Sequence, residues 1–351
     1  MMNNIELYDV TIIGGGPSGL YSAFYSGLRE MKTKIIDFQS ELGGKLHVYP
    51  EKLIWDVGGI PPIPCAQLIA QLTKQAMVFN PKIVLDTKVE RIEKVDDQFI
   101  IHTSMGTKHY SKTVFIATGS GILQPQKLEI EGAERFEISN LHYTIKSFKP
   151  FHNKTVMISG GGNAALDWAN ELVGIAGQVI LTYRKDQMKG HEAHVTQLME
   201  SNVQCCFNTT ITKLIANDQK SAIERVELTN ADTGEKQIVA VDEVVISHGY
   251  EQDISLMEKS PLPLSMKDNY YIAGNSHCET SVAGVYAVGD IVSYDGKLNL
   301  IAGTFQDAAN AVNKAKSYIE PAAKTNGMVS SHNELFKERN REIVQEMLVK
   351  Q

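Results

Sequence analysis

The sequence predicts an α/β fold in which two strand–turn–helix units follow the same plan, and three observations predict this class. At residues 8–19 a short apolar strand runs into three glycines and then into a helical pattern. The same order returns at residues 154–165. Two further apolar strands, at 114–119 and 244–249, also end in glycine. Strands that alternate with helices in this way are typical of a parallel sheet covered by helices.

Length, composition and charge narrow the class of protein. A chain of 351 residues exceeds a usual single domain, and its hydrophobic fraction of 43% can supply two cores. No apolar run approaches the roughly 18 residues of a membrane span, and the N-terminus lacks the pattern of a signal peptide. The formal net charge of -7 argues against non-specific binding to nucleic acid. We therefore expect a cytoplasmic protein that binds neither membrane nor nucleic acid.

Cysteine and histidine spacing predicts neither a C-x-x-C redox disulfide nor a metal site. The four cysteines are Cys65, Cys205, Cys206 and Cys278, and none lies in a C-x-x-C motif. Adjacent Cys205 and Cys206 would point to opposite faces of a strand. Buried structural thiols are the favoured interpretation, with redox chemistry as the alternative. The ten histidines show neither H-x-x-x-H nor H-E-x-x-H spacing, so no metal is expected.

The first glycine turn fits the template of a dinucleotide site. Gly14, Gly16 and Gly19 occupy the three glycine positions of G-x-G-x-x-G. Gly14 permits the tight turn, Gly16 lets a pyrophosphate approach the backbone, and Gly19 lets helix and strand pack closely. Pro17 suits the first helical turn, whose positive end favours a phosphate. The next strand ends in Asp37, where a carboxylate would bind ribose hydroxyls. The alternative is a glycine turn that serves packing alone.

The second glycine turn repeats this plan with alanine in the third position. Gly160 and Gly162 follow a strand, and Ala165 stands where the third glycine would be. Asn163 is a candidate N-cap for the helix that follows. Two such units are most simply explained by two bound nucleotides.

The second strands of the two units end differently. Asp37 ends the first, whereas the strand at 179–185 ends in Arg184 and Lys185, with Lys189 nearby. A carboxylate in this place selects NAD, and cations can pair with the 2′-phosphate of NADP. The pattern therefore favours NADPH over NADH, and the alternative is a solvated basic strand end.

Periodicity and turn residues place further elements. Residues 65–80 are expected to form a helix. Residues 83–91, 97–103 and 107–117 are expected to form strands because of their β-branched content and the turns between them.

The second unit is expected as an insertion in the first. A later strand ends in Gly289-Asp290, which places a carboxylate at the carboxyl edge of a sheet, where ligands bind in open α/β folds. The first Rossmann-like domain therefore comprises residues 1–121 and 280–351, and the second comprises residues 122–279. Apolar residues between 335 and 348 predict a final amphipathic helix.

These features together resemble the thioredoxin-reductase-like (type 2) ferredoxin–NADP(+) reductases, within the superfamily of flavoprotein reductases with two dinucleotide-binding domains. The resemblance covers nearly the whole chain, and four motifs carry it: the turn 14–19, the A-T-G strand end 117–119, the turn 160–165 and the T-x(9)-G-D element 280–290. Thioredoxin reductases themselves carry a C-x-x-C motif before the second unit, and residues 126–153 contain no cysteine. The C-terminal extension at 320–351 is also similar to the type 2 reductases.

The resemblance implies a fold, cofactors and an activity. The fold would be two three-layer ββα dinucleotide-binding domains, with the NADPH domain inserted in the domain that binds FAD non-covalently. A homodimeric ferredoxin–NADP(+) reductase would pass a hydride from NADPH to flavin N5 and then single electrons to ferredoxin or flavodoxin. No side chain would act as an acid or a base in the hydride step.

The resemblance also implies site residues. Tyr49 would stack on one face of the flavin, and His332 or Ser331 would cover the other. Residues expected to bind FAD are Gly14, Gly16, Pro17, Ser18, Gly19, Asp37, Gly44, Lys45, Leu46, Tyr49, Asp56, Val89, Ala117, Thr118, Gly119, Leu123, Asp290, Thr304 and Ser331. Residues expected to bind NADPH are Gly160, Gly162, Asn163, Ala164, Arg184, Lys185 and Lys189.

Departures from the family pattern keep two other functions open. Lys45 stands where the family usually has Gln, and Asn163-Ala164 stands where it usually has Asp-Ser. Tyr183-Arg184-Lys185 replaces a His-Arg-Arg run. One alternative is an NAD(P)H diaphorase or oxidase that reduces quinone, flavin or ferric chelates. The other is an FAD-binding sensor with low turnover.

Overall fold

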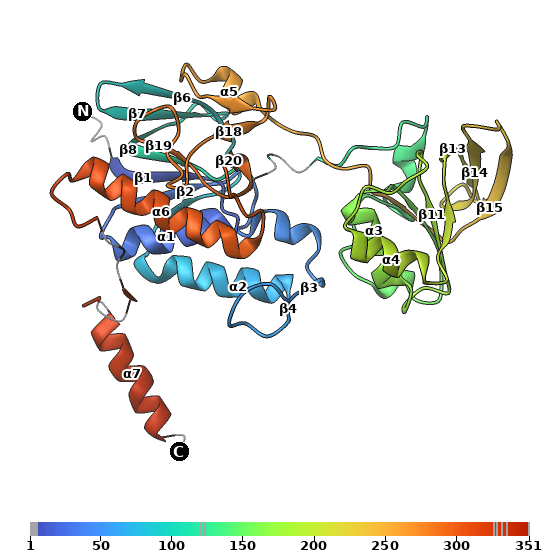
Figure 1. The fold of residues 1–351 in the computed structure, drawn as a ribbon, viewed down its shortest axis with the longest axis horizontal. Coiled ribbons are helices and arrows are strands. Elements are labelled where there is room, and N and C mark those ends of the chain that lie inside the picture. The colour runs from blue at the N-terminus through green and yellow to red at the C-terminus, as the bar shows by residue number, and fades with distance from the viewer. Residues whose placement is uncertain are drawn as a thin grey trace. The chain divides into compact units, whose positions relative to one another are not determined.

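The computed structural model describes residues 6–119, 121, 124–325, 327, 329–330, 333–334 and 336–349. The chain divides into two compact units (Figure 1). Unit 1 comprises Met1–Leu46, Leu53–Ile122 and Gln252–Gln351, and unit 2 comprises His47–Lys52 and Leu123–Glu251. Each unit is built around its own parallel strands, which confirms the predicted fold class.

The main sheet of unit 1 has the strand order β5-β2-β1-β8-β7-β6, and β19 also pairs with β8. β5, β2, β1, β8 and β19 are parallel, whereas β6 and β7 are antiparallel to their neighbours. Ile13 pairs with both Ile36 and Ile116, so the carboxyl ends of three strands meet at one edge. The strands are β1 (Leu7–Ile13), β2 (Thr33–Ile36), β5 (Lys82–Val84), β6 (Val89–Val95), β7 (Gln98–Thr103), β8 (Lys108–Ile116) and β19 (Val285–Ala287).

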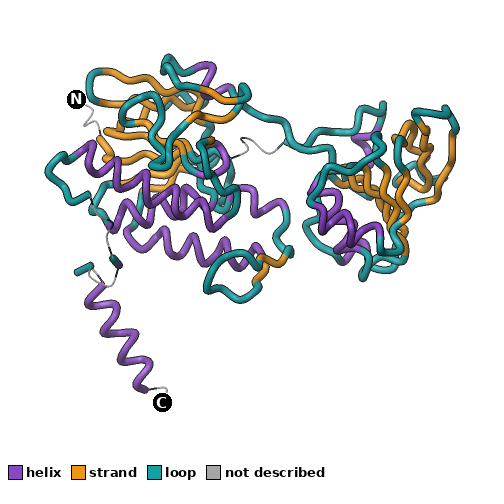
Figure 2. The backbone as a smooth tube through the Cα atoms, in the orientation of Figure 1, coloured by secondary structure: helices purple, strands orange, loops and turns teal. Residues whose placement is uncertain are grey.

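Helices cover one face of this sheet (Figure 2). α1 contacts β1 and β2 and packs against both α2 and α6. Its apolar residues Leu20, Phe24 and Leu28 are buried, as their helical spacing predicts. The helices of unit 1 are α1 (Pro17–Leu28), α2 (Cys65–Ala76), α5 (Ser255–Lys259), α6 (Ile301–Ile319) and α7 (Phe336–Val349), with 3-10 turns at Met77–Phe79 and Gly289–Ile291. A further 3-10 turn at Gly44–Val48 spans the boundary between the units.

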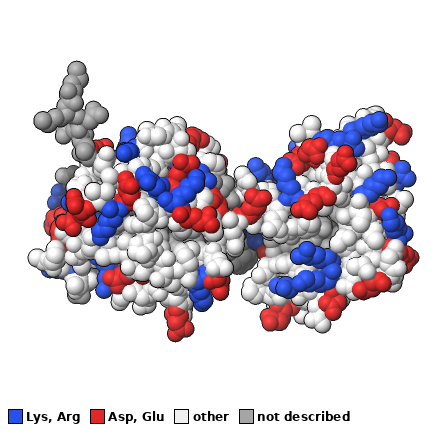
Figure 3. Space-filling model, turned by 90° about the horizontal axis from the view of Figure 1, so that it is seen from above, with Lys and Arg blue, Asp and Glu red and all other residues white. Residues whose placement is uncertain are grey.

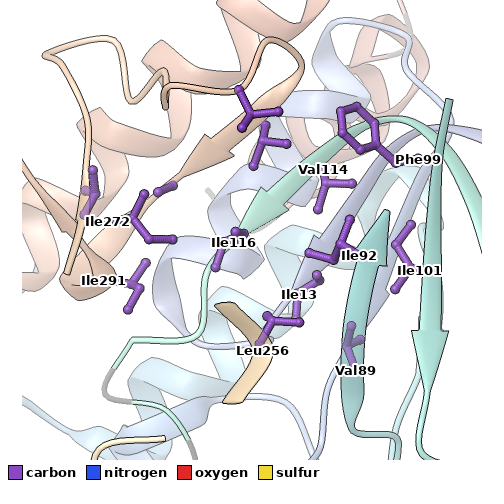
Figure 4. Packing of buried hydrophobic residues seen from close by; sticks show 14 of the residues in the cluster. Ile13, Val89, Ile92, Phe99, Ile101, Val114, Ile116, Leu256, Ile272 and Ile291 are labelled. Atoms are coloured by element: carbon purple, nitrogen blue, oxygen red, sulfur yellow. The ribbon is translucent and has the colours of Figure 1, made fainter. Parts of the chain in front are cut away.

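A core of branched and aromatic side chains lies on the other face of the sheet (Figure 4). Ile13, Ile116 and Phe99 of the sheet pack there with Leu256 and Ile272. The last two belong to residues 252–279, which the sequence analysis assigns to the second domain. The structure places them in unit 1, because their apolar side chains complete this core and β18 pairs with β20. The small strands of unit 1 are β3 (Leu53–Ile54), β4 (Ile63–Pro64), β17 (Met266–Lys267), β18 (Tyr271–Ala273) and β20 (Val292–Ser293).

The stretch 83–91, expected as one strand, contains the end of β5 and the start of β6. Asp86 between them has a φ of 50°, a left-handed conformation that ends a strand. The β-branched residues Ile83, Val84, Thr87 and Val89 lie on both sides of this bend, and therefore the sequence composition hides it.

Unit 2 has three layers. Its five-stranded parallel sheet has the order β12-β11-β10-β16-β9, and a three-stranded antiparallel sheet has the order β13-β14-β15. One core packs α3 against the parallel sheet, and a second joins that sheet to β13 and β14. The elements are β9 (Leu141–His142), β10 (Thr155–Ser159), α3 (Asn163–Leu172), β11 (Gln178–Thr182), α4 (Glu192–Met199), β12 (Gln204–Cys206), β13 (Thr209–Ala216), β14 (Ile223–Asn230), β15 (Lys236–Ala240) and β16 (Glu243–Ile246), with 3-10 turns at Ala133–Phe136 and Lys149–Phe151.

Candidate dinucleotide-binding sites

The first glycine turn lies between β1 and α1, at the carboxyl edge of the main sheet. Gly14 has a φ of 108°, and a Cβ there would collide with the carbonyl oxygen of Ala117. A Cβ at Gly19 would collide with the carbonyl oxygen of Gly14. The tight turn and the close approach of helix to strand therefore both require glycine, as the sequence predicts.

Gly16 leaves room above the turn. It is the N-cap of α1, and an added Cβ would meet nothing closer than the Cα of Gly44, at 3.8 Å. Gly44 has a φ of 58°, and its own Cβ would lie 2.8 Å from the Cα of Gly16. The two backbones lie against each other at the positive end of α1, an end that favours an anion, and the binding of a phosphate there stays a prediction.

Asp37 follows β2 and is buried, with 7% of its surface exposed. Its carboxylate accepts hydrogen bonds from the backbone amides of Gly15 and Gln39. In this structure it therefore ties the glycine turn to the end of β2. Its predicted bond to a ribose stays a prediction.

A second turn reaches the same edge after β19. Gly289 has a φ of 76°, and a Cβ there would lie 2.7 Å from the hydroxyl of Ser18 on α1. Thr304 of α6 is also next to this turn, since its Cγ2 would lie 3.8 Å from the same Cβ. Asp290, the next residue, has an exposed side chain. The structure thus brings Ser18, Asp290 and Thr304 to the turn formed by Gly14–Gly19.

The other residues expected at the FAD site lie in several places. Lys45 and Asp56 are exposed, whereas Leu46, Val89 and Ala117 are buried. Thr118 and Gly119 follow Ala117 at the end of β8 and are half-buried. Leu123, Ser331 and His332 lie outside the described residues.

Tyr49 belongs to the short segment His47–Lys52 of unit 2. It packs against the apolar cluster that contains Trp168. The residues that follow Tyr49 also contact unit 2: Glu51 accepts a hydrogen bond from the Phe148 amide (2.9 Å), and Lys52 pairs with Asp167 (2.7 Å). The stacking of Tyr49 on a flavin stays a prediction.

The second glycine turn joins β10 to α3 in unit 2. Gly160 has a φ of 152°, and its Cβ would collide with the carbonyl oxygen of Ser247, at the end of β16. Ala165 is fully buried. At Gly162 a Cβ would meet no atom within 4 Å, so the backbone faces open space at the positive end of the helix. The turn therefore offers the same kind of phosphate cradle as the first.

Asn163 is not the N-cap of α3, contrary to the sequence prediction. Gly162 is the N-cap, and no side chain caps the helix. The Asn163 side-chain oxygen instead accepts a hydrogen bond from the His191 amide at 2.9 Å. Because that oxygen binds the loop before α4, it accepts no hydrogen bond from the first backbone amides of α3. Ala164, the next residue, is exposed.

Three exposed cations follow β11. The Lys189 amide donates a hydrogen bond to the carbonyl oxygen of Gly161 at 2.8 Å, which ties their loop to the glycine turn. The charge of Lys189 lowers the pKa of Lys185, and Arg184 adds to this effect. Within the described part of the chain, the side chains of Arg184, Lys185 and Lys189 form no ion pair. Cations held this close together favour an anionic ligand, although the Asp186 carboxylate partly offsets the repulsion on Lys185.

His248 also lies at this site, and the sequence analysis did not select it. Its Nε2 is 2.9 Å from the hydroxyl of Ser159, which ends β10. Burial lowers the pKa of His248, and the charge of Arg184 lowers it further. The rule that ligands bind beyond the carboxyl ends of neighbouring parallel strands would have found it, because His248 follows β16.

Cys65 and Cys278 are buried, and Cys205 and Cys206 are half-buried. Cys205 packs against the core that contains α3, and Cys206 packs against the core beneath β13 and β14, which confirms that they point to opposite faces. Burial raises the pKa of both thiols. Among the described residues, no helix is both long enough and apolar enough to cross a membrane.

Comparison with known proteins gives the family. The model of the pyridine nucleotide-disulphide oxidoreductases matches residues 8–315. The chain is 64% identical to ferredoxin–NADP reductase 1 of Bacillus mycoides, over 99% of this chain and 100% of that one. It is 58% identical to ferredoxin–NADP reductase 1 of Lysinibacillus sphaericus, over 98% and 99%. The solved thioredoxin reductase of T. acidophilum is similar over 89% of this chain and 98% of its own, with 25% identity and a TM-score of 0.75. The chain therefore belongs to the pyridine nucleotide-disulphide oxidoreductase family.

Proposed function

We propose that this chain is a ferredoxin–NADP(+) reductase that passes electrons between NADPH and ferredoxin or flavodoxin through FAD. The observation that carries this proposal is identity of 64% over the full length of a relative with that name. The two glycine turns, one in each unit, support the proposal, since each would receive the pyrophosphate of one dinucleotide. No cysteine occurs in residues 126–153, which argues against a disulfide acceptor at that position.

Unit 1 is the proposed FAD site. Gly14, Gly16 and Ser18 would hold the pyrophosphate at the start of α1, and Asp290 would face the ribityl chain from the neighbouring turn. When bound, FAD supplies the chemistry: it takes a hydride and releases electrons singly. The protein's task is to bind and orient the two rings, and no side chain is assigned a proton transfer.

Unit 2 is the proposed NADPH site. Gly160 and Gly162 would hold the pyrophosphate, and Arg184, Lys185 and Lys189 would bind the 2′-phosphate. On the face drawn in Figure 3, Lys and Arg side chains are interspersed with Asp and Glu. Preference for NADPH therefore rests on this local group of cations and not on a broadly basic surface.

We also propose a homodimer. α7 exposes Ile343, Val344, Met347 and Leu348, which are between 52% and 68% exposed. Apolar side chains grouped on one helix favour burial against another chain, and a second copy is the simplest partner.

Ferredoxin-dependent reduction of cytochrome c tests the proposed activity. Purified protein is mixed with NADPH and cytochrome c, with and without ferredoxin. We expect reduction to depend on ferredoxin and to saturate as its concentration rises. Reduction at the same rate without ferredoxin, together with rapid turnover of quinone or ferric chelate, would favour the diaphorase alternative instead.

A further inference from the structure

Asp307 is a buried carboxylate on α6 with several polar neighbours. Only 1% of its surface is exposed, and it lies one helical turn after Thr304. Its carboxylate accepts hydrogen bonds from the Tyr294 hydroxyl at 2.6 Å and from the Gly289 amide at 3.2 Å. Lys297 pairs with it at 2.8 Å and is itself only 6% exposed. This ion pair belongs to the interior of unit 1.

A single tight turn supplies two of these donors. The Lys297 amide donates to the carbonyl oxygen of Tyr294 at 3.2 Å, and Gly296 between them has a φ of 80°. The loop then closes on α6, because a Cβ at Gly303 would collide with the carbonyl oxygen of Leu298. The turn therefore has a fixed position against the first residues of α6.

The third donor connects this network to the candidate flavin site. Gly289 is the residue whose backbone lies against Ser18 at the start of α1, and Asp290 follows it. A carboxylate on α6 thus fixes the amide of the turn that carries Asp290. Gly289 has no side chain that could hold the turn in place, so its backbone amide makes the bond to Asp307.

The chemistry of the network fits a positioning role better than a role in stability alone. Burying a carboxylate and an ammonium costs free energy, and apolar residues of similar volume often serve stability as well. The buried thiol of Cys278 is close to the carboxylate. Burial raises the pKa of this thiol, and the charge of Asp307 raises it further, so the thiol stays neutral. Directional hydrogen bonds offer what an apolar contact cannot, namely a defined place for the Gly289 amide.

We propose that Asp307 is a positioning residue of the flavin site, whose carboxylate, held by Lys297 and Tyr294, fixes the Gly289 turn so that Asp290 faces the ribityl chain. This inference rests on the proposal that unit 1 binds FAD. Asp307 would not touch the cofactor. It would act through the backbone of the turn.

Titration of the apoprotein with FAD tests the inference, with quenching of flavin fluorescence as the readout. Asp307→Asn removes the charge that pairs with Lys297 and replaces one of the two acceptor oxygens with an amide nitrogen, so the carboxylate's three bonds cannot all be kept as they are. We expect its Kd for FAD to rise about tenfold. Tyr294→Phe keeps the ion pair and removes one donor, so we expect a smaller rise of about threefold.

Asp9→Asn is the matched control. Asp9 is also a carboxylate that binds one lysine, Lys112 (2.8 Å), and one backbone amide, that of Lys32 (2.8 Å). It lies on β1 near the amino end of the strand, away from the edge that carries Gly14 and Gly289. We expect its Kd for FAD to match that of the wild type.

The outcomes separate the inference from the function on which it rests. An unchanged Kd in folded Asp307→Asn, or an equal rise in Asp9→Asn, would overturn the positioning role. If Asp307→Asn does not fold, Tyr294→Phe decides: a raised Kd supports the role and an unchanged one overturns it. Failure of the wild type to bind FAD would instead contradict the proposed function.

Discussion

Individual glycines in this chain serve two different purposes, which the structure separates. At Gly14, Gly19 and Gly160, an added Cβ would collide with a backbone carbonyl oxygen, so the fold itself requires glycine. At Gly162 the space is open, so the fold tolerates a side chain there and a bound phosphate would not. The template G-x-G-x-x-G contains both kinds, and the structure shows what each glycine contacts.

Alanine substitutions should therefore separate stability from nucleotide binding. We expect Gly19→Ala to destabilise unit 1 by about 2 kcal/mol, because helix and strand must move apart. Urea unfolding of the apoprotein measures this. Gly162→Ala should leave the free energy of unfolding within about 0.5 kcal/mol of the wild-type value. Its Kd for NADPH should nevertheless rise about tenfold, because the methyl group occupies the phosphate cradle. The reverse pattern would contradict these assignments.

At the scale of residues, the sequence predicted backbone roles better than side-chain bonds. The roles of Gly14 and Gly19 followed from the template and are confirmed. The bond from His191 to Asn163 could not be predicted, because the two residues meet only when the loop before α4 folds back on α3. The network around Asp307 was missed for the same reason: its members come from a turn, a loop and a helix.

Secondary-structure elements were largely predictable where hydrophobic periodicity was strong, as in α1, β8 and α3. The stretch 252–279 was misplaced, because its short strands and loops show no periodicity that assigns them to a unit. Tertiary contacts assign this stretch to unit 1 instead. Tyr270, in this stretch, is buried, and its hydroxyl donates to the carbonyl oxygen of Gly119 at 3.0 Å, so it ties the end of β8 to the stretch.

The hydrogen bond from the buried Tyr270 hydroxyl to Gly119 predicts a loss of stability in strong alkali. Burial raises the pKa of Tyr270 from 10.0 to about 12, with smaller contributions from Tyr271 and Asp290. Because the folded pKa lies above the unfolded one, the stabilisation is complete below pH 10 and is lost as the pH rises toward 12.

Urea unfolding at several pH values above 9 measures this loss. We expect the midpoint of the wild type to fall more steeply with pH than that of Tyr270→Phe, which has no proton to lose. Tyr110→Phe, in β8, serves as the control and should follow the wild type. Parallel curves for the wild type and Tyr270→Phe would contradict the role of this hydroxyl.

The whole chain forms two compact units, and the family match extends over both. The assignment of His47–Lys52 to unit 2 could not be predicted from the sequence, because a six-residue segment has no pattern that shows which unit it packs against. The apolar side of α7 was predicted as an amphipathic face. In the structure of the single chain its residues are exposed, which is the basis for the proposed dimer.

Charge placed on α7 should therefore weaken the dimer. We expect the double variant Val344→Glu, Met347→Glu to shift the mass measured by light scattering from dimer to monomer, because two carboxylates cannot be buried in an apolar contact. Glu346→Gln, on the same helix, is the control and should remain dimeric. A monomeric wild type, or a double variant that stays dimeric at the same concentration, would contradict the proposed contact.

Rapid mixing of the flavin-loaded protein with NADPH, and separately with NADH, tests whether the proposed sites pass electrons from NADPH to the flavin. The bleaching of flavin absorbance is followed at matched concentrations, in the wild type, in Arg184→Gln and in the control Lys213→Gln. We expect fast bleaching by NADPH and slow bleaching by NADH. Arg184→Gln should need about tenfold more NADPH for the same rate, with little change for NADH, because only NADPH carries the 2′-phosphate. Equal rates with both nucleotides in the wild type would contradict the assignment of the 2′-phosphate site, and no bleaching with either would contradict the proposed activity.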